Sequence, residues 1–290
     1  MKNIIFIIAC SIFSIAANSA GTCQNLLIPF YVNPLITPSA WDQMEETHSQ
    51  NQIVIINPTN GPDIGPGSEK YTAYSEKVQR AHDAGLTVLG YVPTGYGVRA
   101  LADVNADVAK YVSWYGVDGI FYDEASAQAK DLEYYQNILD YAHSAIPQAI
   151  AVLNPGVVPD RGYADLKVGA DGKLILVTFE NLYSVYVNLD NTLTPWINYY
   201  PANMFSHLVY GVSTSDEMLN VVKKSKSLNA EYIMVSEGTV LPWNGFSKYN
   251  AELVKATSCL YQQDEYYSRH RHYSHQRDYS HQRDYSHQRN

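Results

Sequence analysis

The chain has 290 residues, of which 46% are hydrophobic and 17% charged, and its formal net charge at pH 7 is −9. This length suits one large domain or two small ones with a sizeable core. Residues 21–263 carry 14 Lys and Arg against 25 Asp and Glu. This acidic balance disfavours nucleic acid as a partner and suits a neutral or cationic ligand, although many secreted proteins are acidic for solubility alone.

Residues 1–20 have the pattern of a secretory signal peptide. One lysine precedes an apolar run from Ile4 to Cys10, and small residues follow near Ser19 and Ala20, where we expect cleavage. A membrane anchor is the alternative, but the run is short for spanning a bilayer and no charged flank follows it. We therefore predict a secreted, extracellular protein with no stable membrane insertion.

The cysteines suggest one disulfide. Cys10 lies in the signal peptide, so the mature chain keeps Cys23 and Cys259, one at each end of the globular part. An oxidising compartment and a fold with adjacent termini would allow these two residues to pair. We favour the Cys23–Cys259 bridge, and two unpaired thiols are the alternative.

Eight short apolar segments are predicted strands. They are rich in Val, Ile and Leu with little polar alternation, which is typical of parallel strands buried on both faces. In chain order they are Leu26–Tyr31, Ile53–Ile56, Thr87–Val92, Gly119–Tyr122, Ala149–Leu153, Leu174–Phe179, His207–Val212 and Tyr232–Val235.

Helical periodicity fills most of the intervals between these strands. The fifth strand is followed instead by a loop around Pro159–Gly162, and the sixth by a Tyr- and Asn-rich segment that reaches Tyr200. The predicted helices are Ser39–His48, Glu69–His82, Ala100–Tyr115, Leu132–Ala145 and Asp216–Ser227.

Eight strands that alternate with helices predict an α/β fold, a single (β/α)8 TIM-type barrel over residues 21–263 with irregular connections in its second half. A doubly wound open sheet is the alternative. Such a sheet usually carries a glycine-rich phosphate-binding turn after its first strand. This chain reads YVNPL there, from Tyr31 to Leu35, without a glycine, so we predict the barrel.

The carboxyl ends of the strands build the active site in a barrel of this kind. Asp123 and Glu124 follow the fourth predicted strand, and Glu180 follows the sixth. Neighbouring carboxyls in a concave site can differ in pKa, so one can protonate the departing oxygen of a glycosidic bond while another attacks the sugar or activates water. Helix capping or pairing with a basic residue is the alternative reading. Other polar residues at predicted strand exits are Asn33, Asn57, Asn154 and Glu237, and Tyr91 lies late in the third predicted strand.

Motifs of serine hydrolases, zinc metalloproteases and phosphate-binding loops are absent from the sequence. The sequence has no GxSxG, HExxH or GxxxxGK[ST] pattern. The histidines of the globular part are scattered without ligand spacing, so we predict no metal and no cofactor. We interpret His207, at the start of the seventh predicted strand, as structural.

Residues 264–290 differ in kind from the rest of the chain. YSHQRD begins at Tyr273 and again at Tyr279, and YSHQRN begins at Tyr285. The repeat offers no aliphatic side chain to bury, so it cannot offset the entropy of ordering the backbone. We predict a disordered tail. Binding of a metal or an anionic surface at low pH by its spaced histidines is the alternative.

Several longer motifs follow one another in a characteristic order: IINPTNGP (Ile55–Pro62), VLGYVPTGYGVRAL (Val88–Leu101), DVAKYVSWYGVDGIFYDEAS (Asp107–Ser126), LNPG (Leu153–Gly156) and VTFEN (Val177–Asn181). In these motifs the chain resembles the spherulin-4-like family, from about Leu26 to Tyr249. The resemblance implies a secreted (β/α)8 barrel of the glycoside hydrolase family 135 type. Characterised enzymes of that family are endo-acting hydrolases of α-1,4-linked galactosamine or N-acetylgalactosamine polymers in microbial exopolysaccharide.

The resemblance carries the family's catalytic acids onto three residues of this chain. It implies Asp123 as nucleophile or charge stabiliser, Glu180 as general acid/base, and Glu124 as the residue that holds or tunes them. The substrate-binding residues that it implies are Tyr31, Asn57, Tyr91, Tyr96 and Asn154. The chain departs from the family pattern at positions that would contact the sugar, which are Asn33, Pro93, Gly95 and the final strand exit VSEGTVLPWNGF.

Two functions fit these observations. The first is a secreted endo-acting glycoside hydrolase that cleaves an α-1,4-linked galactosamine or N-acetylgalactosamine polymer. The second is a non-catalytic polysaccharide-binding protein of a cell wall or spore coat, since a fold does not secure a function. The intact set of carboxylates favours the enzyme, because a family member that had lost its catalytic activity would be expected to lose at least one of them. We expect a monomer whose partner is the polysaccharide.

Overall fold

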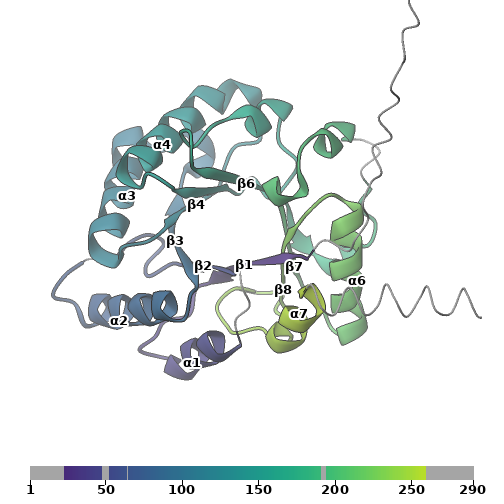
Figure 1. Ribbon diagram of the computed structural model, residues 1–290, viewed down its shortest axis with the longest axis horizontal. Helices are drawn as coiled ribbons and strands as arrows, with labels where there is room; N and C mark the ends of the chain where they lie inside the picture. Colours follow the sequence, from purple (N-terminus) through teal and green to yellow (C-terminus); the bar gives the residue numbers. More distant parts are fainter. Residues whose placement is uncertain (1–22, 48–51, 64, 191–193, 259–290) are drawn as a thin grey trace, which may run out of the picture. The chain divides into compact units, whose positions relative to one another are not determined.

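Eight parallel strands close into a barrel in the chain order β1 to β8 (Figure 1). The predicted fold class, a (β/α)8 barrel, is therefore confirmed. The computed structural model describes residues 23–47, 52–63, 65–190 and 194–258. The strands are β1 Asn25–Phe30, β2 Ile53–Ile56, β3 Thr87–Pro93, β4 Gly119–Asp123, β5 Ile150–Leu153, β6 Lys173–Leu182, β7 Phe205–Tyr210 and β8 Tyr232–Val235.

Three predictions concern segments beyond these residues. The signal peptide over residues 1–20 and the tail over residues 264–290 lie outside the described part of the chain. Cys23 is disulfide-bonded, while Cys259 lies outside the described residues, so the Cys23–Cys259 pairing stays a prediction. Among the described residues, no helix has both the length and the apolar character that crossing a membrane requires.

Branched aliphatic side chains on both faces of the strands form the core. All four residues of β2 are buried, and Ile55 and Ile56 are fully so. In the neighbouring strands, Pro29 of β1 and Leu89 of β3 lie opposite Ile55. Because the barrel interior covers one face and the helices cover the other, the strands need no polar alternation.

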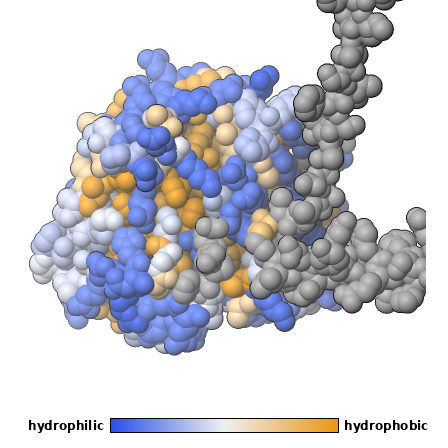
Figure 2. Space-filling model, in the orientation of Figure 1, coloured by the Kyte–Doolittle hydropathy of each residue, from blue (hydrophilic) through white to orange (hydrophobic). Residues whose placement is uncertain are grey.

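The first half of the barrel has regular helical connections. Ser68 caps one of them, since its Oγ accepts a hydrogen bond from the Tyr71 backbone N at 3.0 Å, and Gly116 ends another in the left-handed region at φ +65°. Figure 2 shows hydrophilic side chains around the outer edge of the face and apolar ones nearer its middle. The helices are α1 Pro38–Glu46, α2 Glu69–Asp83, α3 Leu101–Tyr115 and α4 Leu132–Ala145, with the 3₁₀ turns η1 Gly95–Gly97 and η2 Ala129–Asp131.

The second half is irregular, as predicted. A 3₁₀ turn follows β5, and a helix of one turn with further 3₁₀ turns follows β6. The last helix, α7, had no counterpart among the predicted elements. The elements are η3 Arg161–Asp165, α5 Tyr183–Tyr186, η5 Pro195–Tyr199, η6 Ala202–Met204, α6 Ser215–Ser227 and α7 Asn250–Thr257.

Strand β6 is longer than predicted, which changes the position of Glu180. The predicted end at Phe179 is wrong, because pairing with β7 continues to Leu182 opposite Tyr210. The register between the two strands shifts between Val177 and Phe179. Bulges of this kind re-aim the side chains that follow them and occur beside active sites. Glu180 therefore lies within the strand, just after the irregularity, and not at its end.

Candidate active site

Asp123 is the last residue of β4, and two neighbouring strands supply hydrogen bonds to its carboxylate. Tyr91 Oη, from β3, donates to Asp123 Oδ2 at 2.7 Å. Asn154 Nδ2, directly after β5, donates to Asp123 Oδ1 at 2.7 Å. Because β3, β4 and β5 are adjacent in the barrel, their exits lie close together and fix the orientation of this carboxylate.

Glu180 lies deeper in the site, between two donors. Asn154 Nδ2 donates to Glu180 Oε2 at 2.6 Å, and Trp243 Nε1 donates to Glu180 Oε1 at 2.8 Å. Burial raises the pKa of Glu180 above its ordinary value, and the negative charge of Asp123 also raises it, while the hydrogen bonds from Asn154 and Trp243 act in the opposite direction. A carboxyl with a raised pKa retains its proton to a higher pH and is suited to act as an acid.

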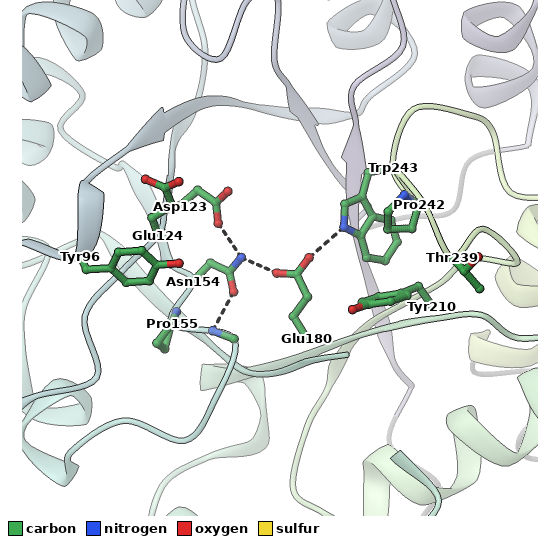
Figure 3. Close-up of a pocket in the computed structure, with 11 residues that line it drawn as sticks. Tyr96, Asp123, Glu124, Asn154, Pro155, Glu180, Tyr210, Thr239, Pro242 and Trp243 are labelled. Atoms are coloured by element: carbon green, nitrogen blue, oxygen red, sulfur yellow. Dashed lines mark hydrogen bonds between the residues drawn. The ribbon is translucent and has the colours of Figure 1, made fainter. Parts of the chain in front are cut away.

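Asn154 joins the two carboxylates through one amide nitrogen (Figure 3). The amide is oriented by its own oxygen, since Asn154 Oδ1 accepts from the Gly156 backbone N at 3.1 Å. The nitrogen therefore faces the carboxylates with both of its hydrogens. Because each accepting oxygen is one hydrogen bond from the same nitrogen, those oxygens of Asp123 and Glu180 lie within about 5 Å of each other.

Tyr31 lies beside this group with its ring edge-to-face against Tyr91, at a centroid distance of 5.4 Å. Burial raises the pKa of Tyr31 well above its ordinary value, and the charges of Asp123 and Glu180 add to the effect. The Tyr31 phenol therefore stays protonated and is available as a donor. Its backbone N donates to the Trp243 carbonyl at 3.0 Å, which links β1 to the segment after β8.

The carboxylates open into a pocket of ≈ 460 Å³, which is within the usual range for small-ligand sites. Its lining contains three carboxylates, aromatic rings from several loops, and neither Lys nor Arg (Figure 3). This chemistry suits a neutral or cationic ligand with hydroxyl groups. The lining residues are Tyr96, Asp123, Glu124, Asn154, Pro155, Gly156, Glu180, Tyr210, Thr239, Pro242 and Trp243.

Glu124 differs from its neighbour Asp123. Its side chain is exposed, and Figure 3 shows its carboxylate on the side of Asp123 away from Glu180. Within the described chain, no hydrogen bond or ion pair reaches this carboxylate. Its backbone is in the left-handed region at φ +50°, which is uncommon outside glycine and is often found at functional sites.

The other predicted ligand-binding residues occupy different positions. Tyr96 lines the pocket and is 64% exposed. Tyr31 and Tyr91 lie behind the pocket lining, against the carboxylates. Asn57 is not among the lining residues, and its Oδ1 accepts from the Gly61 backbone N at 3.1 Å in a turn after β2. The geometry therefore brings Tyr96 and Asn154 together with the carboxylates, and Tyr31 and Tyr91 behind them.

Three further strand-exit and strand residues make structural contacts. Asn33 Oδ1 accepts from the Leu35 backbone N at 3.0 Å, and Glu237 accepts from Ser247 Oγ at 3.2 Å. His207 lies inside β7, buried against Tyr186 Oη at 2.9 Å. Burial lowers the pKa of His207 to about 3, so this ring is neutral at ordinary pH and has a structural role.

The alternative readings of the carboxylates find no counterpart in the described residues. Their ion pairs join other side chains of the barrel and leave out Asp123, Glu124 and Glu180. The N-cap of α4 is Asp131. The described part of the chain also has no group of three or more His, Cys, Asp or Glu that could hold a metal ion.

Trp243 and Tyr210 are the aromatic lining residues that sequence reasoning missed. The other lining residues that were not predicted are Pro155, Gly156, Thr239 and Pro242. Tyr210 ends β7, two residues from the predicted strand end, and Trp243 lies eight residues beyond β8. A loop of that length has no periodicity that would reveal its direction. Its signal is compositional, since Trp243 is one of two aromatic residues, with Phe246, in the segment that departs from the family pattern.

Fold and pocket together define a glycosidase-like (β/α)8 barrel, with Asp123 at the end of β4, Glu124 directly after it and Glu180 within the last residues of β6. The chain belongs to Spherulation-specific family 4, whose model matches residues 25–257. Spherulin-4 of Physarum polycephalum is 32% identical over 248 residues, which cover 81% of this chain and 70% of that protein. The crystal structure of Aspergillus clavatus Sph3 in complex with GalNAc is similar with a TM-score of 0.68 and 26% identity, over 82% of this chain and 98% of that one.

Proposed function

We propose that this protein is a secreted, endo-acting glycoside hydrolase of α-1,4-linked galactosamine or N-acetylgalactosamine polymers. The observation that carries the proposal is the single Asn154 nitrogen that donates to Asp123 at 2.7 Å and to Glu180 at 2.6 Å. It brings two carboxyl groups with different surroundings to one pocket. Family membership and the likeness to a structure with bound GalNAc support an amino sugar as the ligand, and the signal-peptide pattern supports secretion.

In the proposed reaction Asp123 attacks the anomeric carbon while Glu180 gives its proton to the departing glycosidic oxygen. The bond to the departing sugar breaks as an ester bond to Asp123 forms. A water molecule then gives a proton to Glu180 and its oxygen to the anomeric carbon, which releases Asp123 as a carboxylate. The raised pKa of Glu180 supports its role as the acid. Glu124, the third carboxylate of the pocket lining, lies beside Asp123 on the side away from Glu180.

The short distance between the carboxyls supports a retaining reaction. Retaining glycosidases hold their two carboxyl groups about 5–5.5 Å apart, whereas inverting enzymes leave about 6.5–9.5 Å for a water molecule. One amide nitrogen within hydrogen-bond distance of both Asp123 and Glu180 fits the shorter separation. The new reducing end released from Asp123 should therefore first appear in the same anomeric configuration as the bond that was cleaved, which NMR spectroscopy of the early reaction can measure.

The direct test is cleavage of defined polymers. Purified protein is incubated with α-linked amino-sugar polymers of known acetylation, and the products are read by mass spectrometry. Asp123→Asn and Glu180→Gln should each abolish oligosaccharide release, whereas Glu133→Gln, at an exposed site on α4, should retain it. Binding of the polymer without release of oligosaccharides by the wild type would favour the non-catalytic coat protein over the enzyme.

A further inference from the structure

The segment after β4 makes a sharp corner that separates two adjacent carboxylates. Asp123 is hydrogen-bonded into the site, while Glu124, one residue later, is exposed and left-handed at φ +50°. A non-glycine residue adopts this conformation only where its surroundings over-determine it. The contacts that hold the corner therefore decide where Asp123 lies.

Thr94, directly after β3, supplies several of those contacts from outside the pocket. It is fully buried and does not belong to the pocket lining. Its Oγ1 lies 3.0 Å from the Asp123 carbonyl oxygen and 2.8 Å from the Glu124 carbonyl oxygen, and its backbone N donates to the Asp123 carbonyl at 2.9 Å. One side chain thus holds the main chain of both carboxylate residues.

Tyr135, on α4, fixes the direction of the Thr94 hydroxyl. Tyr135 Oη accepts from the Ser126 backbone N at 2.7 Å and lies 3.0 Å from Thr94 Oγ1. Carbonyl oxygens can only accept, so the single Thr94 hydroxyl proton is directed to the two carbonyls, and Tyr135 donates its own proton to Thr94 Oγ1. Thr94 and Tyr135 are both fully buried, so bulk water has no access to replace either hydroxyl.

The opposite side of the same corner is bonded to Asn154. The Ala125 backbone N donates to the Asn154 carbonyl at 2.9 Å, and the Asn154 backbone N donates to the Tyr122 carbonyl at 2.9 Å. A shift of the corner would therefore move both Asp123 and the amide that connects it to Glu180.

We propose that Thr94, oriented by Tyr135, is a positioning residue for the reaction: it holds the corner after β4 and so sets the placement of Asp123 relative to Glu180. The inference rests on the proposed hydrolase function for its kinetic readout, but not for its structural one. It assigns a role to two hydroxyl groups that never touch the substrate.

The test compares Thr94→Val, which keeps the shape and removes the hydroxyl, with Thr94→Ser, which keeps the hydroxyl. A displacement of about 1 Å can reduce turnover on the order of 10²-fold, so we expect a loss of that order in kcat for Thr94→Val with KM nearly unchanged. Thr94→Ser should retain most of the activity, and Tyr135→Phe should lose less than Thr94→Val. Thr257→Val removes a buried hydroxyl that donates to the Leu253 carbonyl at 2.9 Å in α7, and serves as the matched control.

A second readout needs no turnover. NMR titration of labelled Glu carboxyl carbons gives the pKa of Glu180 in the wild type and in Thr94→Val. If the corner relaxes and Asp123 moves away, its charge raises the pKa of Glu180 less, so the value should fall in Thr94→Val and be unchanged in Thr257→Val. A wild type without cleavage would overturn the hydrolase alone. Equal losses for Thr94→Val and Thr94→Ser that follow their melting temperatures, or an unchanged pKa of Glu180, would overturn the positioning role.

Discussion

The two halves of the barrel supply different parts of the site. In the half that contains β3 to β5, regular helices separate strands whose exits lie close together, and Asp123 takes its hydrogen bonds from Tyr91 and Asn154 there. In the half that contains β6 to β8, β6 has an irregular register, its following helix α5 has four residues, and the loop after β8 carries Trp243. Glu180 belongs to this second half.

This difference means that one half of the barrel orients the Asp123 carboxylate, while the surroundings in the other half raise the pKa of Glu180. Asp123 is oriented by side chains from adjacent strands, which suits a group that must point at one carbon atom. Glu180 is buried beside another carboxylate, and its pKa is raised for that reason. Pairs of titratable groups whose surroundings differ in this way commonly divide the roles of nucleophile and acid between them. The regular half thus orients the Asp123 carboxylate, and the irregular half contributes the carboxyl whose pKa is raised, Glu180.

The largest expected effect is the loss of activity on removal of Asp123 or Glu180, and a substrate with an activated leaving group distinguishes the nucleophile from the acid. Loss of a catalytic carboxyl should reduce kcat/KM on polymer by about 10³-fold or more, which is about 4 kcal/mol of barrier. A substrate whose phenolate departs without a proton needs no acid, so an activated aryl glycoside should restore the first step in Glu180→Gln but not in Asp123→Asn. Single-turnover release of the aryl group measures this step. Restoration in Asp123→Asn instead would reverse the assignment of the two halves.

An added methyl group should lower the free energy of unfolding more in the regular half of the barrel than in the irregular half. A Cβ on Gly119 of β4 would lie 1.9 Å from the Ile150 carbonyl oxygen, so strands β4 and β5 would have to separate. We expect Gly119→Ala to lower the free energy of unfolding by about 3 kcal/mol or more. Gly245, in the loop after β8, has no atom of the described residues within 4 Å of an added Cβ. Gly245→Ala should therefore change the free energy of unfolding by less than about 0.5 kcal/mol. Urea unfolding of both variants checks the contrast.

The same contrast explains how much the sequence could predict. In the regular half, β2 Ile53–Ile56 and α4 Leu132–Ala145 agree with the predicted bounds, because apolar runs and helical periodicity there coincide with burial. The position of Asp123 at the end of β4 followed from the same pattern. Local sequence signals suffice where every strand is followed by an amphipathic helix.

The irregular half was less predictable because long-range pairing determines it. The end of β6 depends on pairing with β7 as far as Tyr210, which the sequence of β6 alone does not contain. The position of Trp243 depends on a loop conformation that places its indole N–H against Glu180. The residue type was visible in the sequence, but the direction of the side chain was set by this tertiary contact.

Asn57, after β2 in the regular half, differs for a local reason. Its Oδ1 accepts from the Gly61 backbone N at 3.1 Å in a turn, and the strand pattern does not contain the conformation of that turn.

Loss of the Asn154 amide, which donates to a carboxylate from each half, should have the next largest effect on activity. Asn154→Ala removes the donor to both Asp123 and Glu180, and loss of one preorganised donor in an active site commonly reduces turnover on the order of 10²-fold. We expect a loss of that size in kcat/KM on polymer, with the fold intact by circular dichroism. Asn137→Ala, which removes an exposed amide on α4, is the control. Activity within a few-fold of the wild type would mean that the two halves work without this connection.

The smallest effect should be a shift of the pH profile by Trp243→Phe. The indole N–H donates to Glu180 at 2.8 Å, and this hydrogen bond lowers the pKa of Glu180. Phenylalanine has no such donor, so the pKa of Glu180 should rise. Because the acid must be protonated for the first step, the falling limb of kcat/KM should move to higher pH, while activity on the acidic side should change by only about two- to five-fold, as expected for one neutral hydrogen bond. Trp196→Phe, which alters a ring packed on Phe205, should leave the limb in place. A limb that moves to lower pH would mean that Trp243 stabilises the protonated form of Glu180. The pKa of Glu180 would then be raised by this indole as well as by burial.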